Sequence, residues 1–228
     1  MREIAVFSGS AHPELAAEIC RELGEPLLPV RLLRFANDCL ETQLQSNCRE
    51  RDVFLIQPLS PPVQEHLVEL LLMLDAARGA SAARVTAVIP YYAYARSDKK
   101  DMPRVSIGGR LVADLLITAG ASRVLTMTLH SPQVHGFFSV PVDNLHALRE
   151  HDVSSVRIAC THGLFCDGAL EKIAAEPEVR EIVCTNTVPV SGRLHHDKLT
   201  VLSVAPALAE AIRRIHEGES VSALFEPH

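Results

Sequence analysis

The stretch "RVTAVIPYYAYARSDKK", residues 84–100, decides the fold class of this chain. Its first half is a short run of mainly apolar, partly β-branched residues without polar alternation, which is typical of a strand buried on both faces. Its second half holds all 3 tyrosines of a chain that has no tryptophan, followed by a charged segment. Because a strand buried on both faces needs helices on both sides, the stretch predicts a layered α/β protein with a polar loop after this strand.

On both sides of this stretch, further short apolar runs alternate with segments in which apolar residues recur at helical spacing. The other strand candidates are residues 3–7, 52–58, 123–130, 156–162, 181–189 and 199–205. Residues 61–77 carry apolar side chains at helical spacing, with Ser60 as the expected N-cap and Pro61 in the first turn. A second helix is expected from residue 108 to Gly120, and another from Gly168. This alternation predicts mainly parallel sheets covered by helices.

The bulk composition limits the classes of function. With 228 residues, of which 47% are hydrophobic, the chain can bury a substantial core. A net charge of −6 argues against a general nucleic-acid or membrane surface, so any anion site must be local. The N-terminus lacks a signal-peptide pattern, and Glu69 and Asp75 interrupt the most apolar window, so neither export nor a membrane span is expected.

The 6 cysteines contain no C-x-x-C pair. In a chain of this size they are expected to be reduced thiols of a cytoplasmic protein, with structural or incidental roles. Metal or redox roles are the alternative.

In parallel sheets, ligands bind beyond the carboxyl ends of the strands, so the residues after each run are the candidates. Residues 96–110 hold Arg96, Lys99, Lys100, Arg104 and Arg110 against Asp98 and Asp101. Such a local excess of positive charge can bind phosphates. A solvated loop with aromatic packing is the alternative interpretation.

Histidines follow two other strand candidates. His130 and His135 come after residues 123–129, and Thr161, His162 and Gly163 end the run that starts at 156. Each histidine can be a ligand or a hydrogen-bonded structural residue. His195 and His196 stand in a polar loop and are interpreted as surface residues, and two common glycine-rich nucleotide fingerprints are absent from the sequence.

Five segments in order resemble the ribose-phosphate pyrophosphokinase (phosphoribosyl pyrophosphate synthase) family. They are "FSGSAHPELA" (7–16), "YARSDKKDMPRVSIGGRLVADLL" (94–116), "TLHSPQVHGFFSVPVDNL" (128–145), "ACTHGLF" (159–165) and "SVAPALAEAIRRIHEGESVSALF" (203–225). The resemblance implies a cytoplasmic transferase of nucleotide biosynthesis that uses ATP and magnesium to pyrophosphorylate ribose 5-phosphate. It also implies two phosphoribosyltransferase-like domains in a hexamer assembled from dimers. Residues 1–145 would form the ATP-binding domain, and residues 146–228 would form an incomplete second domain with a C-terminal tail.

The resemblance assigns roles to particular residues. Two segments would bind ATP: Phe35, Asn37, Asp38 and Cys39, commonly from a neighbouring subunit, and Arg96, Ser97, Lys99 and Asp101. His130 would belong to the magnesium site. The tyrosines would then pack to fix the ATP loop, with a stacking role as the alternative.

The chain also departs from the family pattern. Cys39 stands where the family has a glutamate, and Asp38 or Glu41 can substitute for it. Ser97 stands in place of a glutamine, and Thr128 in place of an acid that precedes His130.

The largest departure is a missing middle. Between residues 150 and 156 the family carries a metal-binding aspartate, a lysine-arginine catalytic loop and the loop that binds ribose 5-phosphate, and only His151 to Ser155 stand there in this chain. Either the natural protein contains a stretch that this sequence lacks, or this is a shortened member; the first is favoured because a fold tolerates the loss of strands poorly. The catalytic residues therefore stay unassigned, and the chain as written is predicted to be inactive. A silent regulatory subunit, a plain nucleotide-binding module and, less well, a phosphoribosyltransferase are the alternatives.

Overall fold

The computed structural model describes residues 3–145, 156–165, 168–176, 179–189, 196–221 and 224. Its larger sheet has six parallel strands in the order β2-β1-β5-β6-β7-β8. These strands are β1 (Ile4–Ser8), β2 (Leu27–Leu28), β5 (Asp52–Ile56), β6 (Arg84–Ile89), β7 (Arg123–Met127) and β8 (Val142–Leu145). The four expected strands of this part of the chain are confirmed, and the β6 stretch lies inside the sheet between β5 and β7.

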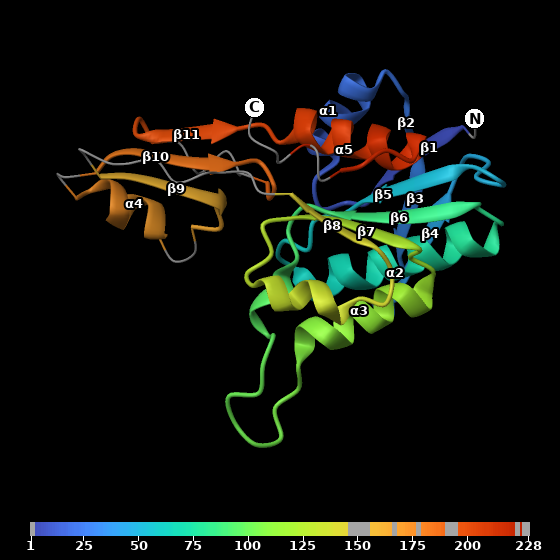
Figure 1. The fold of residues 1–228 in the computed structure, drawn as a ribbon, viewed down its shortest axis with the longest axis horizontal. Coiled ribbons are helices and arrows are strands. Elements are labelled where there is room, and N and C mark those ends of the chain that lie inside the picture. The colour runs from blue at the N-terminus through green and yellow to red at the C-terminus, as the bar shows by residue number, and fades with distance from the viewer. Residues whose placement is uncertain are drawn as a thin grey trace.

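Helices cover both faces of the six-stranded sheet, as a sheet of strands apolar on both faces requires (Figure 1). One face packs against α2 (Val63–Gly79) and α3 (Gly108–Ala119). The other face packs against α1 (Pro13–Leu23) and α5 (Ala205–Glu217). The predicted end of α3 is confirmed, because Gly120 is its C-cap at φ 131°.

The start of α2 differs from the sequence prediction. The helix begins at Val63 after an extended Pro62, so Ser60 is not its N-cap. Ser60 instead offers its main-chain carbonyl to the Nδ1 atom of His66, at 2.7 Å. Two consecutive prolines separate Ser60 from the helix, which places its hydroxyl too far back along the chain to cap the first turn.

A two-stranded antiparallel hairpin stands beside the main sheet. It is formed by β3 (Val30–Arg34) and β4 (Leu40–Leu44), and β4 packs against α2. The turn between the strands, residues 35–39, carries the first set of predicted ATP contacts. Two short 3₁₀ helices, η1 (Ala93–Arg96) and η2 (Pro132–Phe137), follow β6 and β7.

A second, smaller sheet has three parallel strands in the order β11-β10-β9. They are β9 (Val156–His162), β10 (Val179–Thr185) and β11 (Leu199–Leu202), and α4 (Ala169–Ala174) packs against them. Gly168 is the N-cap of α4, which confirms the expected helix start. Both sheets together confirm the predicted α/β class.

The last helix returns to the first sheet. After β11 the chain enters α5, where Leu208 and Ile212 share a core with Leu15 and Ile19 of α1. Figure 1 shows α5 beside α1, apart from the three strands that precede it. The proposed division at residue 145 therefore separates the two sheets, while α5 completes the core of the larger one.

Candidate nucleotide site

A cavity of about 450 Å³ opens where the two sheets meet. Its walls come from the carboxyl ends of β6, β7 and β9, the positions where parallel sheets bind ligands. The lining residues are Tyr91, Tyr92, Ala93, Ala95, Arg96, Thr128, Leu129, His130, Cys160, Thr161, His162 and Leu164. Three of the strand ends selected in the sequence thus converge on one space.

The tyrosine-rich loop after β6 is tied to the start of α3. The hydroxyl of buried Tyr92 donates to the carbonyl of Gly109 at 2.8 Å, and the ring of Tyr94 lies against Gly108. Ser97 accepts the main-chain N–H of Gly108 on its hydroxyl, at 2.9 Å. These contacts confirm the packing role expected for the tyrosines and fix the loop from which Arg96 projects.

Arg96 and His130 are both exposed at the cavity and come from loops that follow adjacent strands. Across the described residues, neither side chain has a hydrogen bond or an ion pair. A guanidinium and an imidazole that are free to take a ligand suit a polyanion such as a nucleotide phosphate chain.

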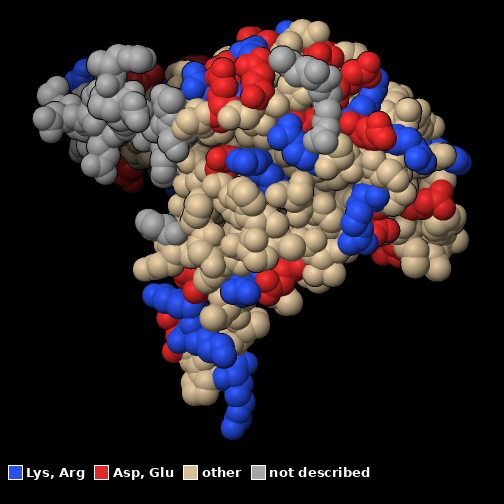
Figure 2. Space-filling model, turned by 45° about the vertical axis from the view of Figure 1, so that its right-hand side comes forward, with Lys and Arg blue, Asp and Glu red and all other residues tan. Residues whose placement is uncertain are grey.

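The basic loop beyond η1 extends away from the body of the protein. Lys99, Lys100 and Arg104 are exposed there, and blue side chains gather on this projection in Figure 2. Lys99 and Asp101 form an exposed ion pair with 3.6 Å between Nζ and Oδ1. Neither of these two predicted ATP contacts lines the cavity.

The second sheet supplies the opposite wall of the cavity. The ring of His162 meets that of Tyr91 edge-on, with centroids 4.8 Å apart, and its Nδ1 atom is 2.8 Å from the hydroxyl of Thr187. Burial lowers the pKa of His162 to about 4, although hydrogen bonding to the main chain at Thr128 and Met127 opposes this shift. His162 is therefore neutral at pH 7. Its contact with Tyr91 could not be read from the sequence, because it joins separate sheets.

Thr128 stores backbone strain at the same place. This β-branched residue has a φ of +48°, in the left-handed region that such side chains avoid. Its main-chain N–H donates to the carbonyl of Leu145 at 2.6 Å, and its hydroxyl accepts from that of Thr161 at 3.2 Å. Strained residues of this kind gather at ligand sites, where the surrounding contacts hold them in place.

The turn at residues 35–39 does not contribute to the cavity lining. Phe35 is 48% exposed, and Asn37 accepts the N–H of Cys39 on its side-chain oxygen at 3.2 Å. Asp38, at a φ of +69°, pairs with Arg34, which also contacts Glu65. The structure therefore brings Arg96 and His130 together but leaves the turn elsewhere on the surface of this chain.

The remaining histidine predictions resolve into structural contacts. The Nε2 atom of His135 is 2.8 Å from the carbonyl of Val142, so this ring ties η2 to β8. His196 accepts the N–H of Lys198 on Nδ1 at 3.1 Å. His195 lies outside the described residues.

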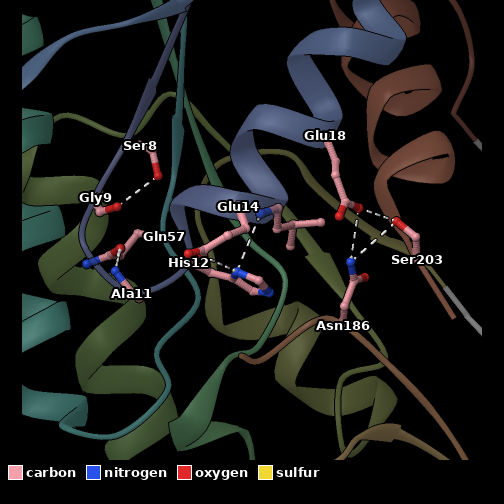
Figure 3. Close-up of polar contacts among 10 residues, drawn as sticks. Ser8, Gly9, Ala11, His12, Glu14, Glu18, Gln57, Asn186 and Ser203 are labelled. Carbon is pink, nitrogen blue, oxygen red and sulfur yellow. Dashed lines mark hydrogen bonds and ion pairs between the residues drawn. The ribbon is translucent and has the colours of Figure 1, made fainter. Parts of the chain in front are cut away.

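A polar cluster joins α1 to the second sheet (Figure 3). The carboxylate of Glu18 accepts from Ser203 at 2.6 Å and from the amide of Asn186 at 3.2 Å. At the start of α1, His12 caps the helix by accepting the N–H of Leu15 at 3.4 Å, while Gln57 accepts that of Ala11 at 3.1 Å. The contacts of Glu18 with Asn186 and Ser203 thus tie the helical layer of the larger sheet to the second sheet.

The cavity offers few side chains that could bind a metal ion. Among the residues that the structure describes, no group of three or more His, Cys, Asp or Glu side chains could hold a metal ion. The cavity lining supplies the imidazole of His130 but no carboxylate, whereas Mg²⁺ prefers oxygen ligands. These residues do not form a magnesium site without oxygens from a ligand.

The fold and the cavity define a class of protein: a two-sheet α/β protein with an arginine and a histidine at a cavity beyond the strand ends. Two family descriptions match the sequence. Residues 4–120 match the N-terminal domain of ribose phosphate pyrophosphokinase, and residues 137–226 match the phosphoribosyl synthetase-associated domain.

Individual relatives agree with these matches. The chain is 54% identical to a putative ribose-phosphate pyrophosphokinase of Streptomyces coelicolor, with 99% of this chain and 98% of the relative covered. It is 41% identical to the ribose-phosphate pyrophosphokinase of Deinococcus radiodurans, with 97% and 98% covered. The crystal structure of phosphoribosylpyrophosphate synthetase from Mycobacterium smegmatis superimposes with a TM-score of 0.88 at 30% identity, covering 95% of this chain and 100% of that one.

The chain belongs to the ribose-phosphate pyrophosphokinase family. The predicted family, fold class and family-level function are confirmed. The alignment with the S. coelicolor relative runs over 312 positions, whereas this chain has 228 residues. The relative therefore carries internal residues that have no counterpart here, in agreement with the missing segment inferred from the motifs.

Proposed function

We propose that the cavity binds ATP as the pyrophosphoryl donor of a ribose-phosphate pyrophosphokinase. In this reaction the anomeric hydroxyl of ribose 5-phosphate takes the pyrophosphoryl group, and phosphoribosyl pyrophosphate and AMP are released. One observation carries the proposal: Arg96 and His130, from loops after neighbouring strands, face the same cavity without partners among the described residues.

The chemistry of the loop fits this role. Arg96 can bind two phosphate oxygens with its planar guanidinium, while Lys99 adds a mobile point charge from the exposed projection. Ser97 positions the loop and does not itself need to contact phosphate, because its hydroxyl accepts the N–H of Gly108 and so holds the loop against α3. Asp101 pairs with Lys99 on the same exposed projection and would orient its ammonium group.

We propose that Mg²⁺ enters with the nucleotide and not as a resident ion. Phosphate oxygens supply the ligands that Mg²⁺ prefers, and His130, which lines the cavity, would contact the ion or its water shell. The bound ion would neutralise phosphate charge. Thr128 offers a hydroxyl in place of a carboxylate, which weakens any metal site formed by the protein alone.

The turn at residues 35–39 supports a homo-oligomeric site. Phe35 is an exposed aromatic side chain on a two-stranded projection, and the turn does not line the cavity of its own chain. We propose that Phe35 and Asn37 contact the adenine in the cavity of a neighbouring copy, with Asp38 and Cys39 beside them. Assembly into dimers and hexamers would place the turns there.

The free thiols bear on the cellular location of the protein, which we propose to be the cytoplasm. The described cysteines, Cys20, Cys39, Cys48, Cys160 and Cys184, are free thiols, which fits a reducing, cytoplasmic location. Within the described ranges, no helix is long and apolar enough to cross a bilayer.

A second candidate function rests on the missing residues. Because the chain is 228 residues long against 312 aligned positions, it can act as a silent subunit that binds nucleotide and assembles without turnover. A plain nucleotide-binding module would bind ATP without assembling with an active enzyme.

Three measurements test these functions. Calorimetric titration with a nonhydrolysable ATP analogue and Mg²⁺ should show saturable binding, and its absence would contradict both candidates. A coupled assay for AMP release that depends on ribose 5-phosphate then separates an enzyme from a silent subunit. The intact mass of the protein purified from its natural source tells whether the middle segment exists there.

A further inference from the structure

Two cysteines face each other across neighbouring strands of the second sheet. Cys160 of β9 and Cys184 of β10 are direct partners in the parallel register. Directly opposed residues of adjacent strands project from the same face, and strands lie about 4.8 Å apart. Disulfides join Cα atoms about 4.4–6.8 Å apart, so the register alone places this pair within reach of one another.

The same face of the sheet shows that the pair is built into packed structure. The preceding partners on that face, Ile158 and Ile182, pack against α4. Cys184 is fully buried, and a Cβ atom placed on Gly163 would lie 2.9 Å from its sulfur. Cys160 is only partly buried and lines the cavity. One thiol therefore meets the cavity while the other lies behind it.

Burial keeps both groups as thiols at neutral pH. It raises the pKa of Cys184 to about 11, with a further contribution from the neighbouring Cys160, and it also raises the pKa of Cys160. Thiolates and not thiols attack disulfides, so exchange at this pair is slow at neutral pH and accelerates in mild alkali.

We propose that Cys160 and Cys184 form a dithiol site that closes to an intramolecular disulfide by exchange with small disulfides entering the cavity. The Cys160 thiolate attacks one sulfur of the small disulfide and releases its other half as a thiol. Deprotonated Cys184 then attacks the Cys160 sulfur in the mixed disulfide and releases the second half. The two protein thiols are oxidised, and one small disulfide is reduced to two thiols.

The role of each cysteine follows from its position. Cys160 is the entry sulfur because it lines the cavity, and Cys184 resolves the adduct because it is its register partner. Cys20 and Cys48 are buried on other elements, and the structure gives neither a cysteine as a strand partner. For Cys160 and Cys184 the proposal therefore replaces the expected structural or incidental role by a redox role.

The experiment uses the full chain in a Cys39→Ser, Cys166→Ser background, which removes the exposed cysteine and the one that lies outside the described residues. The protein is incubated with cystamine in mild alkali, and its intact mass is measured. We expect loss of two hydrogens with no retained adduct. Cys184→Ala should stop at one mixed disulfide, Cys160→Ser should not react, and Cys48→Ser should behave like the background protein.

A second probe tests the pairing without oxidation. Phenylarsine oxide condenses with two neighbouring thiols and releases water, so one arsenical should bind per chain and be lost in Cys160→Ser and in Cys184→Ala. Denatured background protein serves as the control for reagent activity. If folded protein keeps a mixed adduct, stays unmodified while the denatured chain reacts, or binds arsenical equally well in the single variants, the dithiol site is refuted.

Discussion

Replacing Arg96 by alanine should weaken ATP binding through the loss of a single charged contact. A hydrogen bond to a charged group contributes about 1.5–3 kcal/mol, which corresponds to roughly 10–150-fold in affinity. Arg96 is exposed at the mouth of the cavity, so water and salt screen the interaction and favour the lower end of that range. Since Arg96 has no partner among the described residues, its removal breaks no internal contact, and the melting temperature should stay unchanged.

Calorimetry with a nonhydrolysable ATP analogue at two ionic strengths measures this effect. Arg21→Ala is the matched control, because it removes the same charge from an exposed position on α1 that does not line the cavity. We expect a loss of about tenfold for Arg96→Ala, smaller at high salt, and none for Arg21→Ala. Equal affinities of Arg96→Ala and the parent chain would show that the phosphates do not bind at this loop.

Four further predictions follow from the same cavity. His130→Ala should weaken analogue binding only when Mg²⁺ is present; a melting temperature lowered equally with and without Mg-ATP, at unchanged affinity, would make the residue structural. The chain as written should release no AMP in response to ribose 5-phosphate, because the positioning lost with the missing loops can account for about 7–11 kcal/mol of the barrier, whereas a version with the family's middle segment should be active. The pKa of His162, lowered from 6.5 to about 4, means that the unfolded chain takes up the proton first. Stability should therefore fall as the pH drops from about 6.5 to about 4, by up to roughly 3 kcal/mol, and His162→Gln should lose this part of the pH dependence of unfolding. Bound ATP analogue should slow the reaction of Cys160 with cystamine, and an unchanged rate would place the nucleotide outside this cavity.

The inner strands of the larger sheet could be predicted because burial on both faces leaves a continuous apolar run, as in β5 and β6. The missed elements lack that signal. β3 and β4 have only exposed and half-buried positions in a small hairpin, β2 has two residues, and β8 contains Asp143 and Asn144. Asp143 is accommodated by an ion pair with Arg123 of β7, at 2.6 Å, which only the strand order explains.

The site was predictable to the extent that strand ends are predictable. Arg96 and His130 follow apolar runs, so the topology of a parallel sheet brings them to one edge. The strained backbone of Thr128 and the contact between Tyr91 and His162 depend on how the second sheet docks, and no local pattern encodes docking. The Cys160–Cys184 pairing needs the strand register, which a shift after Cys184 further obscures.

Because α5 returns to the larger sheet, the smaller sheet is an insertion and not a C-terminal addition. In chain order, β9, β10 and β11 form an insertion within a body that begins with β1 and ends with α5. Residues can be gained or lost inside this insertion while both helical layers of the larger sheet stay in place. Removing α5, in contrast, would take Leu208 and Ile212 out of the core that they share with Val6, Phe54 and Leu125 of that sheet. Family members that differ in the length of the insertion can therefore share the body built on the larger sheet, and its integrity depends on the last helix of the chain.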